Sequence, residues 1–405
     1  MYYAAQRLLR YVKYDTQSDE RSSDCPSSPG QKVLAKVLVS ELKDMGIEGA
    51  AMDEKGYVTA AIPANITGKI PTVGFIAHMD TSPEVSGTDV KPRLTEDYDG
   101  GDIRLGEGLV LSPKEFPHLK DYIDDTIITA SGDTLLGADD KAGVSEIMSA
   151  AEYLTKHPEV KHGTVKIAFT PDEEIGRGVD LFDVKDFGAD FAYTMDGGPI
   201  GELSCENFNA ASCEVTVHGR SIHPGDAKDK MKNAVLIASE YALMLPPQET
   251  PAHTERYQGF YHIDHFEGTV ERAQLAYIIR DFDRVNFEKR KQVMIAAAET
   301  LNKKYGKGTV EVAIKDQYYN MKEKLEDKMY IVDIAKKAME EAGIEVKLTP
   351  IRGGTDGAQL SYMGLPTPNI FTGGQNFHGR FEYIPVGSME KAVDVILNII
   401  KDICK

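Results

Sequence analysis

Short apolar runs that alternate with helical patterns constrain the fold of this 405-residue chain more than any other feature. The runs lie at residues 73–77, 127–129, 165–169 and 191–195, and a helical pattern at 144–154 separates the second run from the third. Runs that are mostly apolar, without alternation of apolar and polar residues, are typical of strands buried on both faces of a parallel sheet. The pattern therefore predicts an α/β domain in which helices flank a mostly parallel sheet.

The pattern changes between residues 208 and 320, where strand-like runs alternate apolar and polar side chains. Strand-like and helical stretches follow one another there at 213–217, 233–245, 274–279, 287–302 and 309–314. This order indicates a separate α+β insert. After residue 321 the α/β pattern returns and ends in a helical stretch at 388–403. We therefore expect a discontinuous main domain at 1–207 and 321–405, interrupted by an inserted domain at 208–320.

Charge and apolar content exclude several classes of protein. The formal net charge is −18, whereas phosphate binding requires a basic face, so we expect no nucleic-acid partner and no anionic membrane surface. Arg7, Arg10 and Lys13 interrupt the apolar residues near the N-terminus, and no signal-peptide core is expected there. No apolar run reaches the roughly 18 residues that a membrane span needs. The four cysteines are scattered without ligand spacing, which favours the reducing cytoplasm.

Acidic and imidazole side chains follow the predicted strands, at the point where each strand ends. In open α/β sheets, ligands collect beyond the carboxyl ends of the strands. One acidic residue in such a place is often only a helix cap, but five such cases together describe a pocket rim. The residues at these strand ends are His78, Asp80, Asp139, Asp140, Glu173, Glu174, Asp196 and His378.

This set of side chains indicates a catalytic metal site. Imidazole and carboxylate ligands without cysteine suit zinc, manganese or cobalt. Two histidines with three or more carboxylates exceed the needs of one tetrahedral ion. A dinuclear site with a bridging carboxylate fits better, and two such ions activate water and polarise a carbonyl oxygen in hydrolases.

Local spacing suggests roles for some of these residues. His78 and Asp80 are two apart at a strand end and face the same way, so Asp80 can orient the imidazole through its other nitrogen. Glu173 and Glu174 are adjacent and point apart in an extended chain. One of them can bind metal while the other takes a proton from water, and spacing alone leaves the assignment open.

The chain resembles the aminoacylase and carboxypeptidase-like dizinc metallopeptidase family, and within it the tripeptide aminopeptidases. The ligand positions follow the family order, and the likeness extends across nearly the whole chain. The segments that carry it are LLGADDKAG, AFTPDEE, ENFNAAS, YIIRDFDR, YYNM, PIRGGTDGAQLS and FTGG. The main domain would accordingly be catalytic, and the insert would be a ferredoxin-like lid.

The resemblance implies two Zn²⁺ per subunit, with Co²⁺ or Mn²⁺ as possible substitutes. It makes Asp139 the bridge, because the family bridge lies two residues before the lysine, here Lys141. Ala142 then stands where the wider family has glycine. The remaining implied roles are His78 and Asp196 on one zinc, Glu174 and His378 on the other, Glu173 as general base, and Asp80 as the residue that orients His78.

Four residues of the insert and its surroundings complete the implied site. A lone His-Pro-Gly sequence indicates a turn, but the resemblance makes His223 a residue that stabilises the oxyanion. Arg280 and Arg352 would anchor peptide carboxylate or carbonyl groups, since guanidinium pairs bidentately with carboxylate. Asn233 is a further substrate-binding candidate. Because the family often pairs through its lid, we also expect a homodimer.

The function implied is removal of the N-terminal residue from short peptides, by a metal-bridging water that a glutamate activates. A carboxypeptidase, a dipeptidase and an N-acyl amino-acid deacylase are alternatives, because their metal chemistry is identical and only pocket contacts differ. A non-catalytic metal-binding relative would lack the base or a ligand. Every such position is filled in this sequence.

Overall fold

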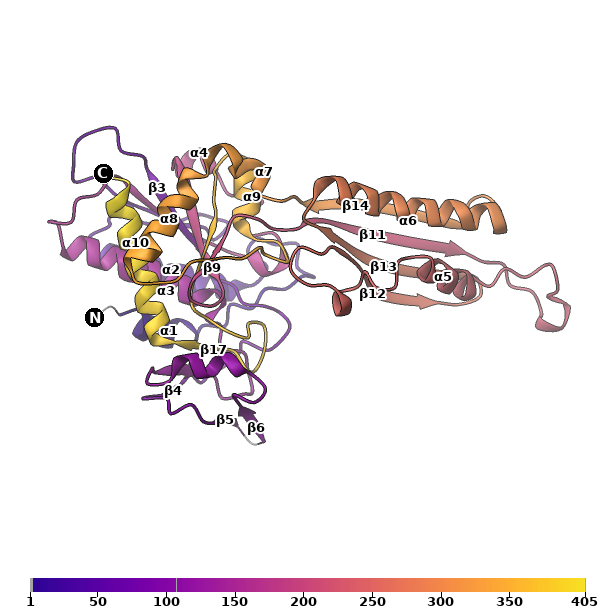
Figure 1. Ribbon diagram of the computed structural model, residues 1–405, viewed down its shortest axis with the longest axis horizontal. Helices are drawn as coiled ribbons and strands as arrows, with labels where there is room; N and C mark the ends of the chain where they lie inside the picture. The colour runs from indigo at the N-terminus through magenta and orange to yellow at the C-terminus, as the bar shows by residue number, and fades with distance from the viewer. Residues whose placement is uncertain (1–2, 107, 405) are drawn as a thin grey trace. The chain divides into compact units, whose positions relative to one another are not determined.

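The structure is a computed structural model that describes residues 3–106 and 108–404 and divides into two compact units (Figure 1). The first unit comprises Met1–Cys205, Met321–Thr349 and Thr355–Lys405, and the second comprises Glu206–Asn320 and Pro350–Gly354. The short segment 350–354 falls within the predicted main domain, but a bridge between Asn207 and Ile351 joins it to the second unit. Within the described ranges, no helix has the length and apolar character of a membrane span.

A mixed sheet forms the centre of the first unit. Its strand order is β1-β2-β8-β3-β9-β16-β10-β15. The inner strands β8, β3, β9 and β16 are parallel neighbours, whereas β2 and β10 join them in antiparallel pairing. The strands are β1 (Ala51–Met52), β2 (Val58–Ile62), β3 (Val73–His78), β8 (Val165–Thr170), β9 (Phe191–Gly197), β10 (Glu202–Ser204), β15 (Lys347–Leu348) and β16 (Asn369–Phe371). The predicted α/β class is confirmed.

Helices cover this sheet, and every residue of β3 is buried. Helix α3 packs on β3 and β9 and contacts α1 and α10, while α9 packs on β9 and α2 on β2. Helix α3 extends well beyond the predicted 144–154. The helices are α1 (Ala4–Tyr11), α2 (Pro29–Asp44), α3 (Ala138–Lys156), α4 (Val184–Phe187), α7 (Lys322–Leu325), α8 (Tyr330–Glu341), α9 (Asp356–Met363) and α10 (Val386–Asp402).

The run at 127–129 is a strand, but its predicted place in the main sheet is wrong. Strand β7 (Ile127–Thr129) lies between β17 (Tyr383–Pro385) and β4 (Arg93–Thr95) in a small antiparallel sheet. A short run of mostly apolar residues indicates burial on both faces but not the identity of the neighbouring strands. A further hairpin pairs β5 (Ile103–Gly106) with β6 (Leu109–Leu111).

The second unit has ferredoxin-like topology, as predicted. The chain runs through β11 (Asn209–His218), α5 (Ala234–Leu243), β12 (Phe260–Gly268), β13 (Arg272–Asp281), α6 (Arg284–Tyr305) and β14 (Val310–Tyr318). The strands form an antiparallel sheet in the order β12-β13-β11-β14, and α5 and α6 pack together on it (Figure 1). The strand predictions omit β12, because most of its side chains are exposed and its polar residues mask any alternation.

Alternate residues of these strands form the core of the second unit. Val215 and Leu275 face the helices and pack in one buried cluster with Tyr241, Phe287 and Met294. Burial of each such side chain contributes roughly 1.5–3 kcal/mol to folding. The alternation that marked the insert in the sequence therefore reflects a sheet with helices on one face.

Candidate metal centre

The first unit gathers seven of the predicted site residues at one edge of its main sheet. Parallel strands present their carboxyl ends at the same edge, so residues distant in sequence meet there. These residues are His78 at the end of β3, Asp80 just after it, Asp139 at the start of α3, Glu173 and Glu174 in a short 3₁₀ turn after β8, Asp196 in β9, and His378 in the loop between β16 and β17.

Asp139 stands between the two histidines. Its Oδ1 lies 3.0 Å from Nε2 of His78, and its Oδ2 lies 3.2 Å from Nε2 of His378. Each carboxylate oxygen thus faces a different imidazole. This is the placement that a carboxylate shared by two metal ions requires.

Each histidine also approaches a second carboxylate. Asp196 Oδ1 lies 3.5 Å from Nε2 of His78, and Glu174 Oε2 lies 2.9 Å from Nε2 of His378. The potential ligand atoms of His78, Asp139 and Glu174 all fall within 4.8 Å of one another. Through its two histidine contacts, Asp139 adjoins both the pair of His78 with Asp196 and the pair of His378 with Glu174.

Asp140 is also close enough to count among the potential ligands, since one of its oxygens lies within 4.8 Å of ligand atoms of His78 and Asp196. Its two oxygens, however, each accept a backbone hydrogen bond, Oδ2 from the amide of His78 at 3.1 Å and Oδ1 from that of Gly143 at 3.2 Å. Burial, followed by the carboxylate of Asp196, raises the pKa of Asp140 well above its ordinary value. These contacts favour a structural role for Asp140.

Asp80 contacts both the histidine and the glutamate pair. Its Oδ1 lies 3.3 Å from Nδ1 of His78, the ring nitrogen that faces away from Asp139. The same carboxylate accepts the backbone amides of Glu173 at 3.0 Å and Glu174 at 3.2 Å. The fully buried carboxylate of Asp80 therefore contacts the imidazole and also accepts both backbone amides of the turn that carries the two glutamates.

The electrostatics of the cluster favour a bound cation. Burial would lower the pKa of His78, but its hydrogen bonds to Asp139, Asp196 and Asp80 raise it well above the ordinary value. Hydrogen bonds to Asp139 and Glu174 raise the pKa of His378 to about 11. Positive charge beside these carboxylates is therefore stabilising, and either protons on the histidines or metal ions can supply it.

A buried polar atom provides an independent test of metal fit. Oε1 of Glu174 is buried and has no hydrogen-bond partner within the described part of the chain. An unsatisfied buried carboxylate oxygen costs free energy, and a divalent cation beside it removes that cost. Imidazole nitrogens and carboxylate oxygens are ligands of zinc, manganese and cobalt, so the residues present fit such ions.

Glu173 is a partly buried residue whose backbone amide donates to Asp80. Burial, and next the carboxylate of Asp196, raise the pKa of Glu173 well above its ordinary value. A carboxylate whose pKa is raised accepts a proton more readily, which suits a general base.

Glu382 is a contributor to this site that the sequence predictions omit. Its buried carboxylate accepts the amides of Leu136 at 2.7 Å, Gly137 at 2.8 Å and Asp139 at 3.1 Å. It therefore anchors the turn that presents Asp139. Its one sequence signal is its position four residues after His378, and an isolated glutamate there looks like a surface residue.

We predict that Glu382→Gln weakens metal binding without removing any ligand. The glutamine amide can keep one acceptor oxygen but places a donor opposite backbone donors, so the Asp139 turn should loosen. Loss of such an outer contact typically lowers metal affinity or activity by about 10–100-fold. Competition with a fluorescent chelator measures the affinity, and unchanged affinity in the folded variant would contradict the prediction.

The predicted residues His223 and Asn233 lie in the second unit. The side chain of His223 is 81% exposed, and its Nδ1 accepts the amide of Gly225 at 3.2 Å in a short turn. Asn233 caps α5 by accepting the amides of Val235 and Leu236. The Asn233 oxygen is thus used in capping, whereas the exposed His223 ring is open to solvent.

Arg280 and Arg352 also belong to the second unit and donate to backbone carbonyls there. Nη1 of Arg280 donates to Ile279 at 3.0 Å, and its guanidinium lies 5.3 Å from the ring centre of Tyr318. Nη1 of Arg352 donates to the carbonyl of Gln258 at 3.1 Å. Both guanidinium groups therefore have partners within their own unit.

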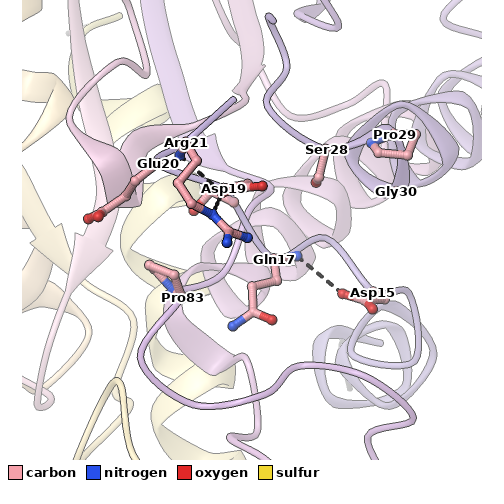
Figure 2. Close-up of a pocket in the computed structure, with 10 residues that line it drawn as sticks. Asp15, Gln17, Asp19, Glu20, Arg21, Ser28, Pro29, Gly30 and Pro83 are labelled. Atoms are coloured by element: carbon pink, nitrogen blue, oxygen red, sulfur yellow. Dashed lines mark hydrogen bonds and ion pairs between the residues drawn. The ribbon is translucent and has the colours of Figure 1, made fainter. Parts of the chain in front are cut away.

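A pocket of about 520 Å³ adjoins the chain segment that follows Asp80 (Figure 2). Gln17 and Pro83 line it, and Gln17 donates to the carbonyl of Ser82 at 3.1 Å. Arg21 and Asp19, also in the lining, form an ion pair that Figure 2 shows as a dashed line. None of the seven residues of the metal centre lines this pocket.

Comparison with known proteins identifies the family. The model of "Peptidase family M20/M25/M40" matches residues 135–402, which include most of the metal centre. The chain belongs to peptidase family M20/M25/M40. The predictions that the chain is an enzyme and that it belongs to this group of peptidases are thereby confirmed.

Similar members of the M20 family carry consistent descriptions. The chain is 61% identical to Peptidase T of Clostridium novyi over 397 residues, with 98% of each chain covered. It is 60% identical to Peptidase T of Caldanaerobacter subterraneus over 398 residues, covering 98% of this chain and 97% of that protein. The solved structure of aminopeptidase PepT from Bacillus cereus superposes with a TM-score of 0.79 at 26% identity, covering 99% and 98% of the two chains.

Proposed function

We propose that this chain is an aminopeptidase that uses two zinc ions to remove the N-terminal residue from tripeptides. One observation carries the proposal: Asp139 places its two oxygens 3.0 and 3.2 Å from two different imidazoles, each beside a further carboxylate. The similarity to proteins described as Peptidase T supports the aminopeptidase activity and the peptide substrate.

In the proposed centre, five side chains of the cluster would supply the ligands of the two ions. His78 and Asp196 would hold one ion, Glu174 and His378 the other, and Asp139 would lie between them. When bound, the ions polarise the carbonyl of the peptide bond and lower the pKa of the attacking water.

The chain's own residues would move the protons. Glu173 would take a proton from the attacking water and then give it to the leaving amine. Asp80 would hold the His78 ring through Nδ1 and keep Nε2 directed at the cluster. Because Asp80 also holds the amides of Glu173 and Glu174, one carboxylate would set the geometry of base and ligands together.

We assign substrate binding to the second unit. His223 would stabilise the oxyanion, since its ring is exposed. Arg280 or Arg352 would pair with the substrate carboxylate, and Asn233 would contribute a weaker polar contact. We also propose that two chains pair through this unit, whose edge strand β12 exposes Ile263 and Phe266, and that the protein acts in the cytoplasm.

Metal removal tests the core of the proposal. Treatment with a chelator such as EDTA should abolish tripeptide cleavage, and Zn²⁺, Co²⁺ or Mn²⁺ should restore it. Elemental analysis of the reconstituted protein should find two divalent ions per chain, because the donor atoms form two groups around Asp139. A fully active preparation that contains no metal would overturn the proposal.

A substrate series separates the aminopeptidase from its alternatives. Ala-Ala-Ala should be cleaved, while its N-acetylated form and an N-acyl amino acid should not, because an aminopeptidase requires the free amine. The C-terminally amidated tripeptide should show a raised KM, since a charged hydrogen bond contributes roughly 1.5–3 kcal/mol. Preferential cleavage of the N-acyl substrate would instead indicate a deacylase, and release of the C-terminal residue a carboxypeptidase.

A further inference from the structure

We propose that Asp172 is a positioning residue that sets the direction of Glu173, an inference that rests on the proposed function of Glu173 as general base. Asp172 is 1% exposed, and both of its carboxylate oxygens accept hydrogen bonds from Ser27, just before α2, and from Gln31 in the first turn of α2. Its Oδ2 accepts the amide of Ser27 at 2.7 Å, and its Oδ1 accepts Nε2 of Gln31, also at 2.7 Å. The hydroxyl of Ser27 donates to the same Oδ1.

The backbone of Asp172 is held by the same neighbours. Its amide donates to Oε1 of Gln31 at 3.1 Å, so Gln31 contacts both the side chain and the main chain of Asp172. The backbone φ of +56° lies in the left-handed region, which residues other than glycine adopt infrequently. The carbonyl of Asp172 accepts the amide of Arg177 at 3.0 Å and closes the turn that contains Glu173.

Hydrogen bonds therefore hold the turn of Asp172, Glu173 and Glu174 from two sides. Asp80 accepts the amides of Glu173 and Glu174 from the metal side, while Ser27 and Gln31 hold Asp172 from the helix side. Since Asp172 directly precedes Glu173, a change in its left-handed backbone would redirect the Glu173 side chain. The ligand Glu174 keeps its own contact with Asp80, so metal binding should depend less on Asp172.

A residue that only stabilises the fold would have a different signature. A structural loss lowers thermal stability without changing kcat of the folded fraction. A misplaced base lowers kcat instead, because displacement of a catalytic group by about 1 Å can cost about 10²-fold in rate. KM and metal content should remain unchanged, as neither depends on the direction of Glu173.

The test is Asp172→Asn, in which an amide donor replaces one of the acceptor oxygens and faces the donors of Ser27 or Gln31. We expect kcat for Ala-Ala-Ala to fall by about 10–100-fold in the zinc-loaded enzyme, with wild-type KM and zinc content. The same substitution is then introduced into Glu173→Gln. If Asp172 acts through Glu173, adding Asp172→Asn to Glu173→Gln should lower kcat by no more than about twofold. The effects of groups that act as a unit are not additive.

Asp125→Asn is the matched control. Asp125 also accepts backbone amides, from Thr126 at 2.7 Å and Gly387 at 3.1 Å, and lies outside the metal centre. The substitution Asp125→Asn should leave kcat unchanged in the wild-type enzyme and in Glu173→Gln. If Asp172→Asn fails to fold, Ser27→Ala and Gln31→Ala replace it in the same double-mutant comparison with Glu173→Gln. Each should lower kcat by about 2–10-fold in the wild-type enzyme and have no effect in Glu173→Gln.

Three results would overturn the inference: wild-type kcat in Asp172→Asn, a full multiplicative loss in the Glu173→Gln background, or loss of zinc together with activity. Its failure is distinguishable from failure of the proposed function. If Glu173→Gln by itself retains full activity, the general base is misassigned, and both proposals fall together.

Discussion

Replacing Glu173 by glutamine is expected to lower kcat by about 10²–10⁴-fold, because the amide cannot take the proton of the attacking water. Metal content should stay at the wild-type level, since Glu173 is assigned no ligand role. Steady-state kinetics on Ala-Ala-Ala, with elemental analysis of the same preparation, measure both quantities. Glutamine matches the size of glutamate, so the turn held by Asp80 should persist.

Glu174→Gln is the control for this experiment. The two residues are adjacent and both hydrogen-bond to Asp80 through their amides, so a general disturbance of the turn would affect both variants alike. Because Glu174 Oε2 lies 2.9 Å from His378, its substitution should remove metal from one site first. Loss of both ions from folded Glu173→Gln would make Glu173 a ligand instead of a base.

Asp139→Ala is expected to lower metal stoichiometry sharply and to abolish activity with it. Each oxygen of Asp139 faces one histidine, so this one substitution removes a ligand from both groups of donor atoms. Hydrogen bonds from His378 and His78 outweigh the effect of burial and lower the pKa of Asp139, which keeps it charged. Elemental analysis and circular dichroism together separate metal loss from unfolding.

Asp140→Ala provides the comparison for Asp139→Ala. It would leave the buried amides of His78 and Gly143 without their acceptor, at a cost of about 1–3 kcal/mol in folding free energy for each group. Thermal stability should therefore fall while more metal remains than in Asp139→Ala. The reverse ranking in metal content would make Asp140 the shared ligand.

Features with a local physical cause could be predicted from the sequence. Apolar runs at 73–77, 165–169 and 191–195 correspond to β3, β8 and β9, because strands buried on both faces have few polar residues. The proximity of the His78 and Asp80 side chains could be predicted, because a separation of two residues at a strand end puts both on one face. The order of the metal-site motifs was sufficient to indicate the family.

Only the tertiary structure decided which partners these residues have. Strand β7 looks like any apolar run, yet it pairs with β4 and β17, because the choice of partner depends on chain segments far away in sequence. Glu382 stands outside every motif and Asp172 lies in AFTPDEE without a predicted role, although each is buried with several hydrogen bonds. Contacts such as that between Asp172 and Gln31 span 141 positions, and no local pattern encodes them. The sequence by itself determined the fold class, the family and the residues available for chemistry. The folded chain decided which carboxylates face the two imidazoles and which face backbone amides, because that depends on side-chain direction in three dimensions.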